Sequence, residues 1–347
     1  MSKVYVHLLV WNDRRYLPDL FDSLQTQSYK DFTTRVLDNG SMDDTLKFIQ
    51  EKHPRTLVAR NNKNAGFAPA HNQLMKFTVE HLEEDEEDPF VLVLNSDMIL
   101  HPDLIGTLVR ALENNPKLAA VQPKLFRAFG EVTGDDALVD VTLSDILDTT
   151  GMGVRKAWRM FDRGAGELDE GQYDKQTDIF GPTGTCALFR LSALMDVLVD
   201  DEVFDGDFFA YKEDCDLAWR LRKAGWDSLF VPTATAHHYR GMFGAQKQSL
   251  WQRIKNRRSQ RPFFAALSTR NQVFMLLKNL SFLGFLKSSP RLIIGDGGRI
   301  LYGFIFEKET RSRLLSSLPL FFKMLKKRKQ IKINPEVTEE SISNYVS

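Results

Sequence analysis

The chain has 347 residues, of which 43% are hydrophobic and 27% are charged. That length is sufficient for a large hydrophobic core, and no apolar run reaches the roughly 18 residues that a membrane-spanning helix needs. The two cysteines, Cys186 and Cys215, are too few for a disulfide framework and lack the spacing of a metal site, as is usual in a reducing compartment. We therefore expect a cytoplasmic protein without a membrane span.

The net charge of zero hides a strong asymmetry along the chain. Residues 1–240 contain 26 Lys and Arg against 40 Asp and Glu, whereas residues 241–347 contain 20 against 6. This division predicts an acidic body followed by a basic part that meets an anionic partner. A membrane surface is the simplest such partner. No nucleic acid is expected, because no recognised binding motif accompanies the basic residues.

The first 114 residues alternate between strand and helix patterns. Short apolar, β-branched runs predict strands at 4–11, 32–37, 56–59 and 90–94. Apolar residues at helical spacing, with start signals before them, predict helices at 17–24, from 41 onward, at 68–79 and at 103–114. This alternation is typical of parallel strands joined by right-handed helical crossovers, so we predict an α/β fold with a mostly parallel sheet.

The strand from Phe90 to Leu94 is the most informative, because it stops abruptly at Asn95, Ser96 and Asp97. Five apolar residues in a row indicate a strand that is buried on both faces of a sheet. Ligands of open α/β sheets bind beyond the carboxyl ends of such strands, where Asp97 could hold a divalent metal ion against a phosphate. Taken alone, the stretch is equally consistent with a carboxylate that only caps a loop.

Polar residues also follow the first two strands, as Asn12-Asp13 and as Asp38-Asn39-Gly40-Ser41. All three sets of strand-end residues are expected along one crevice, because the carboxyl ends of parallel strands share one edge of the sheet. Neither a glycine-rich dinucleotide fingerprint nor a P-loop sequence is present. Phosphate must therefore be held in another way, and a metal ion on Asp97 could do so, supplemented by backbone amides near residues 64–67.

Four motifs occur in the order of one known family. They are Asp38-Asn39-Gly40-Ser41-x-Asp43, Asn64-Ala65-Gly66-Phe67-Ala68-x-Ala70-x-Asn72, Leu94-Asn95-Ser96-Asp97, and Phe208-Phe209-Ala210-Tyr211-Lys212-Glu213-Asp214-Cys215-Asp216-Leu217-Ala218-Trp219-Arg220 with Gly225-Trp226. With these motifs the chain resembles the family 2 glycosyltransferases of the GT-A fold, over residues 4 to about 245. Segments 148–151, 163–167 and 181–184 most resemble the bacterial rhamnosyltransferase-like branch.

The resemblance implies a GT-A catalytic domain at residues 1–245, a mostly parallel sheet flanked by helices. Residues 1–125 would form its nucleotide-sugar-binding half and residues 126–245 its acceptor half. The Gly- and Asp-rich segment 126–180 is expected to carry a mobile lid. A basic amphipathic helical extension would follow at 246–333, and the polar residues 334–347 are expected to be frayed.

By resemblance, Asp38 would bind the base or ribose of a nucleotide-sugar donor, although the same carboxylate could instead cap the helix that starts near Ser41. Asn64, Gly66 and Asn72 would shape the loop under the donor, and a purely structural role for them stays open. The expected donor-binding residues are Asn12, Asp38, Asn39, Ser41, Asn64, Gly66, Asn72, Asn95, Asp97 and Arg240.

By resemblance, Asp97 is also the expected ligand of Mg²⁺ or Mn²⁺, bridging to the donor diphosphate. Many members of the family carry Asp-x-Asp here, whereas this chain has Asn95 at the first position, so the metal is expected to depend more on the donor. His237 or His238 could complete the site. Adjacent residues of an extended segment point to opposite faces, so only one of the two can face the metal, and the sequence leaves both open.

Glu213 and Asp214 begin an expected helix. By resemblance, Asp214 is the general base that takes the proton from the acceptor hydroxyl, and Glu213 orients or stabilises it. The alternative is that acidic residues merely favour a helix N-terminus. Gly184, Tyr211 and Trp219 are expected at the acceptor, although aromatic residues more often belong to the core.

Beyond residue 245, apolar blocks at 273–286 and 314–325 are accompanied by Lys and Arg. Two interpretations stay open. The helices could lie on an anionic membrane, as a peripheral attachment to the inner face of the cell membrane, or they could pack on the catalytic domain or in a homodimer interface.

Together these patterns predict an inverting, metal-dependent glycosyltransferase. It would move a sugar, with rhamnose suggested by the branch, from a dTDP- or UDP-sugar to a glycan or lipid-linked acceptor in cell-surface polysaccharide synthesis. A sugar-1-phosphate nucleotidyltransferase would need a glycine-rich loop after the first strand, which residues 12–15 lack. A catalytically silent membrane adaptor is the third interpretation, and the presence of both Asp97 and Asp214 argues against it.

Overall fold

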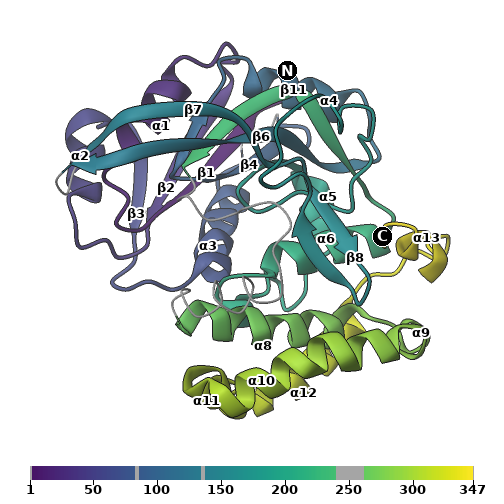
Figure 1. The fold of residues 1–347 in the computed structure, drawn as a ribbon. Coiled ribbons are helices and arrows are strands. Elements are labelled where there is room, and N and C mark those ends of the chain that lie inside the picture. The colour runs from purple at the N-terminus through teal and green to yellow at the C-terminus, as the bar shows by residue number, and fades with distance from the viewer. Residues whose placement is uncertain (1, 83–85, 134–136, 240–261, 347) are drawn as a thin grey trace.

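The computed structural model describes residues 2–82, 86–133, 137–239 and 262–346 (Figure 1). A mixed nine-stranded sheet forms the centre of this part of the chain. Its strands follow the order β3-β2-β1-β4-β10-β6-β11-β5, and β7 pairs with β6. Helices cover both faces, and a further group of helices lies below them (Figure 1).

The first half follows the predicted alternation. Its elements are β1 (Val4–Val10), α1 (Leu17–Gln25), β2 (Phe32–Asp38), α2 (Thr45–Lys52), β3 (Leu57–Arg60), α3 (Phe67–Glu80), β4 (Phe90–Asn95), β5 (Met98–Leu100) and α4 (Leu104–Glu113). Strands β3, β2, β1 and β4 are parallel, as predicted. The helix expected from residue 41 begins four residues later, because a turn from Asp38 to Ser41 precedes it.

The second half was less predictable. It contains β6 (Leu118–Thr133), β7 (Ala137–Thr149), β8 (Met152–Arg155), β9 (Arg159–Asp162), β10 (Cys186–Arg190), α5 (Leu191–Asp196), the short 3-10 helix η1 (Gly206–Phe208), α6 (Glu213–Ala224) and β11 (Asp227–Tyr239). Strand β10 runs antiparallel to β4 and β6, and β11 runs parallel to β6. Much of the segment expected to carry a lid therefore folds as paired strands.

The side chains of β4 alternate between two hydrophobic clusters. Leu92 and Leu94 pack in the cluster that contains α1 and α4, whereas Val91 and Val93 pack against α3, α5 and α6. All four side chains are fully buried. The prediction that this strand is buried on both faces is confirmed, and its carboxyl end is thereby held rigidly at the edge where ligands bind.

The C-terminal part forms a helical layer. Its elements are α8 (Pro262–Asn279), α9 (Phe282–Leu292), the π-helical turn η2 (Ile293–Gly297), α10 (Gly298–Phe306), α11 (Lys308–Ser316), α12 (Leu318–Lys327), η3 (Arg328–Gln330) and α13 (Glu339–Ser343). Phe274 and Met275 of α8 and Met324 of α12 share a buried cluster with Phe208 and Trp219 of the body. Of the interpretations left open, packing on the domain is therefore observed. Within the described ranges, no helix is long and apolar enough to cross a membrane.

The expectation of a frayed tail is wrong for residues 334–346. Val346 pairs with Val154 of β8, and the hydroxyl of Tyr345 donates to Asp178 over 2.7 Å. The ring of Tyr345 also meets Phe180 edge to face. The tail is polar on average, but its few apolar and aromatic residues contact the body. The sequence does not reveal these contacts.

Candidate active site

One cavity of about 570 Å³ gathers most of the chemically interesting residues. It lies between the end of β4, the segment before β10, the start of α6, the β8–β9 hairpin and α8. Its lining includes Asn95, Thr183, Gly184, Thr185, Tyr211, Glu213, Asp214, His238, Phe264 and Ser268. The sequence predicted five of these residues as site residues: Asn95, Gly184, Tyr211, Glu213 and Asp214, and it offered His238 as one of two alternatives.

Asp214 is held in a defined position at the start of α6. One of its carboxylate oxygens, Oδ2, accepts the backbone N–H of Gly184 over 3.2 Å, and Oδ1 accepts the N–H of Cys215 over 2.7 Å. A Cβ at position 184 would meet that of Asp214 at 3.4 Å, so the small residue allows the loop to approach closely. A carboxylate in this position can accept a proton from a hydroxyl group that enters the cavity.

Glu213 is buried beside Asp214. Burial, and then the charge of Asp214, raises the pKa of Glu213 to about 8. Its Oε2 atom has no hydrogen-bond partner among the described residues. The raised pKa favours the neutral form of this carboxyl group, which does not place a second negative charge next to Asp214.

His238 lies between two carboxylates. Its Nε2 atom is 3.1 Å from Oδ1 of Asp97, and its Nδ1 atom is 2.8 Å from Oδ2 of Asp148. Burial alone would lower the pKa of His238, but the charges of Asp97 and Asp148, together with the hydrogen bonds to them, raise it to about 9. His237 faces the other way and stacks on Phe126, with ring centroids 5.4 Å apart. The structure thus selects His238 from the adjacent pair.

The raised pKa favours the protonated form of His238, so a divalent metal ion bound at Nε2 would replace the proton there. In metal sites a carboxylate commonly holds one ring nitrogen of a histidine so that the other nitrogen can bind the ion, and Asp148 holds Nδ1 in this way. The second oxygen donor is Asp97. Among the described residues, no group of three or more His, Cys, Asp or Glu side chains gathers to hold a metal. Asp97 and His238 are the two residues of this arrangement that would hold an ion, with its remaining positions open to substrate and water.

The expected donor residues at the ends of β1 and β2 form a connected set of loops. Asp38 is fully buried, accepts the N–H of Ser41 over 2.9 Å and pairs with Arg60 at 3.1 Å. Asn39 accepts the N–H of Ala65 over 3.0 Å, and its side chain donates to Asn64 over 3.1 Å. Asp38 thus closes the turn from Asp38 to Ser41 but does not cap α2, whose first residue is Thr45, and Asn39 joins this turn to the loop before α3.

Asn12 completes these loops. It adopts a left-handed conformation with φ 57°, accepts the N–H of Met42 over 2.8 Å, and its own N–H donates to Ser41 over 3.0 Å. Gly66 needs its positive φ of 93° and its missing side chain, because a Cβ there would lie 2.6 Å from Phe209. The backbone of the loops is thereby shaped by their own polar side chains.

Comparison with known proteins now identifies the family. A model described as "Glycosyltransferase like family 2" matches residues 2–261. The chain belongs to this family. It is a glycosyltransferase, and its mostly parallel sheet with flanking helices is the GT-A fold.

Two proteins are similar to the chain in sequence, and one solved structure is similar in fold alone. The chain is 27% identical over 232 residues to N-acetylglucosaminyl-diphospho-decaprenol L-rhamnosyltransferase of Mycobacterium tuberculosis, covering 65% of this chain and 72% of that protein. It is 24% identical over 236 residues to rhamnosyltransferase WbbL of Escherichia coli, covering 62% and 81%. The crystal structure of GalNAc-T7 with UDP, GalNAc and Mn²⁺ aligns with a TM-score of 0.60 at 10% identity, covering 99% of this chain and 56% of that one.

Several expected site residues of this glycosyltransferase do not line the cavity, and two of them, Trp219 and Asn72, support the packing of the body instead. Trp219 is only 2% exposed and stacks on Trp158 at 4.6 Å, so it belongs to the core rather than to an acceptor site. Asn72 holds the backbone of Phe204 through two hydrogen bonds of 2.6 and 3.0 Å, which fixes α3 against the loop before η1. Tyr211, by contrast, is 49% exposed at the cavity. Arg240 lies outside the described residues.

Sequence reasoning missed two acidic residues of the glycosyltransferase. Asp148, on β7, orients His238. The sequence pointed to Asp148 only through segment 148–151, which contributed to the resemblance to the rhamnosyltransferase-like branch. Asp13 was noted only as a polar strand end. It accepts the hydroxyl of Ser96 over 2.6 Å, and burial, with a contribution from Asp97, raises its pKa to about 6. Asp13 thereby ties the end of β1 to the loop that carries Asp97.

Proposed function

We propose that this glycosyltransferase transfers a sugar from a nucleotide-diphosphate donor to an acceptor hydroxyl in a single displacement that inverts the anomeric carbon. The observation that carries the proposal is that the carboxylate of Asp214 and the imidazole of His238 line the same cavity. An acceptor hydroxyl next to Asp214 then attacks a sugar whose diphosphate lies toward His238 and Asp97. No carboxylate is assigned as a nucleophile, so a retaining double displacement has no support.

In this mechanism Asp214 takes the proton of the attacking hydroxyl, and Glu213 stays neutral and donates a hydrogen bond to a bound sugar. The loops at Asp38, Asn39 and Asn64 support the nucleotide at the ends of β1 and β2. Holding donor and acceptor together in one cavity supplies orientation that would otherwise cost entropy.

We further propose that Asp97 and His238 hold Mg²⁺ or Mn²⁺, which when bound neutralises the charge of the leaving nucleoside diphosphate. The hydrogen bond between His238 and Asp148 supports this assignment, because it leaves Nε2 directed at Asp97. The presence of Mn²⁺ in the structural neighbour GalNAc-T7 is consistent with it.

For the substrates, we propose a rhamnosyl donor, with dTDP or UDP as the nucleotide, and a lipid-linked acceptor in cell-surface polysaccharide synthesis. Support comes from the two rhamnosyltransferase relatives, one of which is named for a decaprenol-linked acceptor.

The test is a panel of dTDP-, UDP- and GDP-sugars, incubated with the full chain and with candidate lipid-linked acceptors, with and without Mn²⁺. We expect metal-dependent release of nucleoside diphosphate with one donor class, and an inverted linkage in the product by NMR. Release of pyrophosphate from a sugar 1-phosphate and a nucleoside triphosphate would favour a nucleotidyltransferase. If no donor turns over with any acceptor, the proposed function is wrong.

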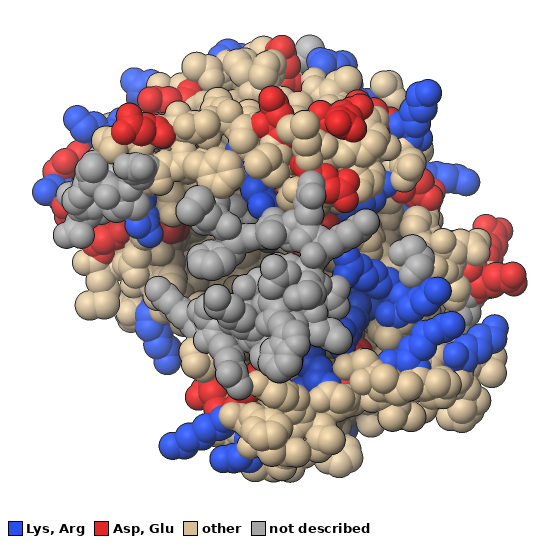
Figure 2. All heavy atoms as spheres, in the orientation of Figure 1, with Lys and Arg blue, Asp and Glu red and all other residues tan. Residues whose placement is uncertain are grey.

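We also propose that the outer surface of the C-terminal helices docks on an anionic membrane, where a lipid-linked acceptor resides. These helices expose a set of large apolar side chains: Phe282, Leu283, Phe285, Leu286, Ile293, Ile294, Leu301, Phe304, Ile305, Phe306, Leu315, Leu318, Phe322 and Leu325. Figure 2 shows that the lower rim of the molecule, formed by these helices, is mostly uncharged and is bordered by Lys and Arg. Apolar surface next to cations is typical of helices that lie in a membrane interface.

Replacing Phe282 and Phe322 by Ser should weaken flotation with liposomes that contain anionic lipid. These side chains are 71% and 70% exposed, so their loss removes apolar surface from the membrane contact without opening the core. Met42→Ser is the matched control. Met42 is 94% exposed but lies between β2 and α2 rather than on the C-terminal helices, so this variant should float like the wild type. Equal flotation of all three proteins, or a stable dimer that the double variant breaks, would contradict membrane docking.

A further inference from the structure

We infer that Asn271 of α8 is a positioning residue for the catalytic carboxylates, which makes the C-terminal helices part of the active site rather than an appendage to it. The inference rests on the proposed role of Asp214. It concerns the loop from Asp207 to Lys212, which leads directly into Glu213 and Asp214 at the start of α6.

The side-chain amide of Asn271 holds three backbone carbonyl groups of this loop. Its Nδ2 atom lies within hydrogen-bond distance of the carbonyl oxygens of Phe208 at 2.9 Å, Ala210 at 2.9 Å and Tyr211 at 2.7 Å. The amide has two hydrogens, so at least one of them is shared between two of these oxygens. Asn271 is fully buried. Its neighbour Arg270 donates from Nη2 to the carbonyl oxygens of Asp207 and Phe208, and from Nε to the oxygen of Asn271. The middle of α8 thus binds the carbonyl groups of residues 207, 208, 210 and 211, whereas that of Phe209 accepts the N–H of Ala68 and that of Lys212 the N–H of Asp216.

The loop needs such support because its backbone is strained. Phe209 has φ 65° and ψ −63°, and the N–H of Ala210 donates to the carbonyl of Phe208 over 2.8 Å. These values describe a γ-turn of the rare, high-energy kind. Tyr211 and Lys212 follow with φ of 70° and 74°, a left-handed conformation that side chains other than glycine disfavour. Without the three hydrogen bonds, the loop would relax and Glu213 and Asp214 would move with it.

The same loop touches both substrate regions. Ala210, Tyr211 and Lys212 line the cavity together with Asp214, as do Phe264 and Ser268 of α8, and the ring of Phe264 lies 5.6 Å from that of Tyr211. The carbonyl of Phe209 accepts the N–H of Ala68 over 3.1 Å, at the start of α3 and next to the donor loop. Asn271 is therefore positioned to set the distance between the base and the donor.

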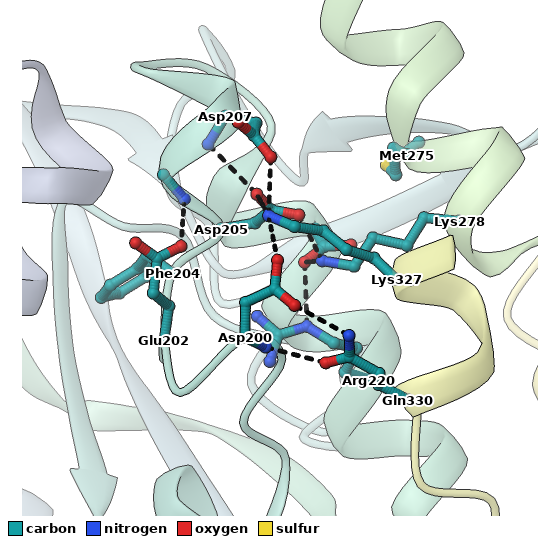
Figure 3. Close-up of polar contacts among 12 residues, drawn as sticks. Asp200, Glu202, Phe204, Asp205, Asp207, Arg220, Met275, Lys278, Lys327 and Gln330 are labelled. Carbon is teal, nitrogen blue, oxygen red and sulfur yellow. Dashed lines mark hydrogen bonds and ion pairs between the residues drawn. The ribbon is translucent and has the colours of Figure 1, made fainter. Parts of the chain in front are cut away.

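A buried ionic network fixes α8 itself to the body (Figure 3). Lys278, on α8, pairs with Asp205 at 2.7 Å and with Asp216 at 2.8 Å, and all three side chains are completely buried. Lys327, from α12, reaches the same region and pairs with Asp205 at 2.5 Å and Asp207 at 2.7 Å. Asp216 lies two residues after Asp214, so α8 and α12 hold the base-bearing helix and the loop before it together.

The test is Asn271→Ala in the full chain, compared with Gln272→Ala. Gln272 is the next residue of α8 and is also buried, but its amide donates to the carbonyl of Trp158, away from the loop. We expect Asn271→Ala to lower kcat by about 100-fold, because small displacements of reacting groups have effects of that order, while its affinity for nucleoside diphosphate changes less than kcat does. Gln272→Ala should retain most of the wild-type kcat, although its melting temperature should be comparable to that of Asn271→Ala.

Hydrogen exchange provides a readout that does not need turnover. Amides of residues 208–215 should exchange faster in Asn271→Ala than in the wild type and in Gln272→Ala. The inference is overturned if Asn271→Ala keeps kcat within about three-fold of the wild type, because misplaced reacting groups cause a far larger loss. It is also overturned if Gln272→Ala loses as much kcat as Asn271→Ala. A third contradicting result is unchanged hydrogen exchange at residues 208–215 in Asn271→Ala. If the wild type transfers no sugar at all, the proposed function fails, and the exchange experiment alone decides whether Asn271 positions the loop.

Discussion

Asp214→Asn is expected to reduce transfer by about 10²- to 10⁴-fold, the range that general-base catalysis usually contributes. The amide has nearly the shape of the carboxylate but cannot accept a proton. Its single oxygen keeps only one of the two accepted hydrogen bonds, from Gly184 or from Cys215. Nucleoside diphosphate should bind as it does to the wild type, because the donor loops lie at the ends of β1 and β2. The measurement is kcat for acceptor transfer, together with donor affinity by calorimetry.

Glu213→Gln is the matched control, since the two residues are adjacent and each change replaces a carboxyl group by an amide. The raised pKa of Glu213 means that its carboxyl group is already neutral at pH 7, so Gln resembles the form that is present. We expect it to retain far more activity than Asp214→Asn. If Asp214→Asn transfers at the wild-type rate, or if Glu213→Gln alone is inactive, Asp214 is not the base.

His238→Ala is expected to weaken metal-dependent donor binding by two orders of magnitude or more, whereas His237→Ala should have little effect. The reason is that the two imidazole rings point in different directions. Nε2 of His238 is 3.1 Å from Asp97, whereas the ring of His237 stacks on Phe126 outside this site. Asp148→Asn should have an intermediate effect, since residues that orient a metal ligand commonly contribute about 10- to 100-fold. Titration of Mn²⁺ in the presence of nucleoside diphosphate measures all three.

These two neighbouring histidines make the experiment specific. A general loss of stability at this end of β11 would affect both variants, whereas a metal site affects one. Equal losses for His237→Ala and His238→Ala would contradict the assignment. So would donor binding in the wild type that is the same with Mn²⁺ and with a chelator.

Much of the N-terminal half could be predicted because its signals are local. The apolar run of β4 is read from five consecutive residues, and the alternation of strands and helices up to α4 implies both the parallel pairing and the edge where ligands bind. The candidate base could also be predicted, because Glu213 and Asp214 stand next to each other in a motif. Residues 118–162 were not assigned, since strands β6 to β9 pair over long and irregular registers.

Other features depend on contacts between residues far apart in the chain. Asp148 and His238 are separated by 90 positions, and the amide of Asn271 reaches carbonyl groups that are 60 to 63 positions away. Trp219 occurs in the family motif, yet its ring turns into the core against Trp158. No periodicity or spacing encodes which side chains meet across such distances.

The amino-acid sequence by itself determined the fold class, the family and the candidate base, because apolar periodicity and motif order are properties of neighbouring residues. Only the tertiary structure decided that His238 rather than His237 faces Asp97, since a single step along a strand reverses the face. It likewise decided that α8 and α12 belong with the catalytic body. Their sequence pattern fits a membrane or a protein partner equally well. The packing on the body is shown by the contacts of Asn271, Lys278 and Lys327, whose partners are distant in sequence and adjacent in space.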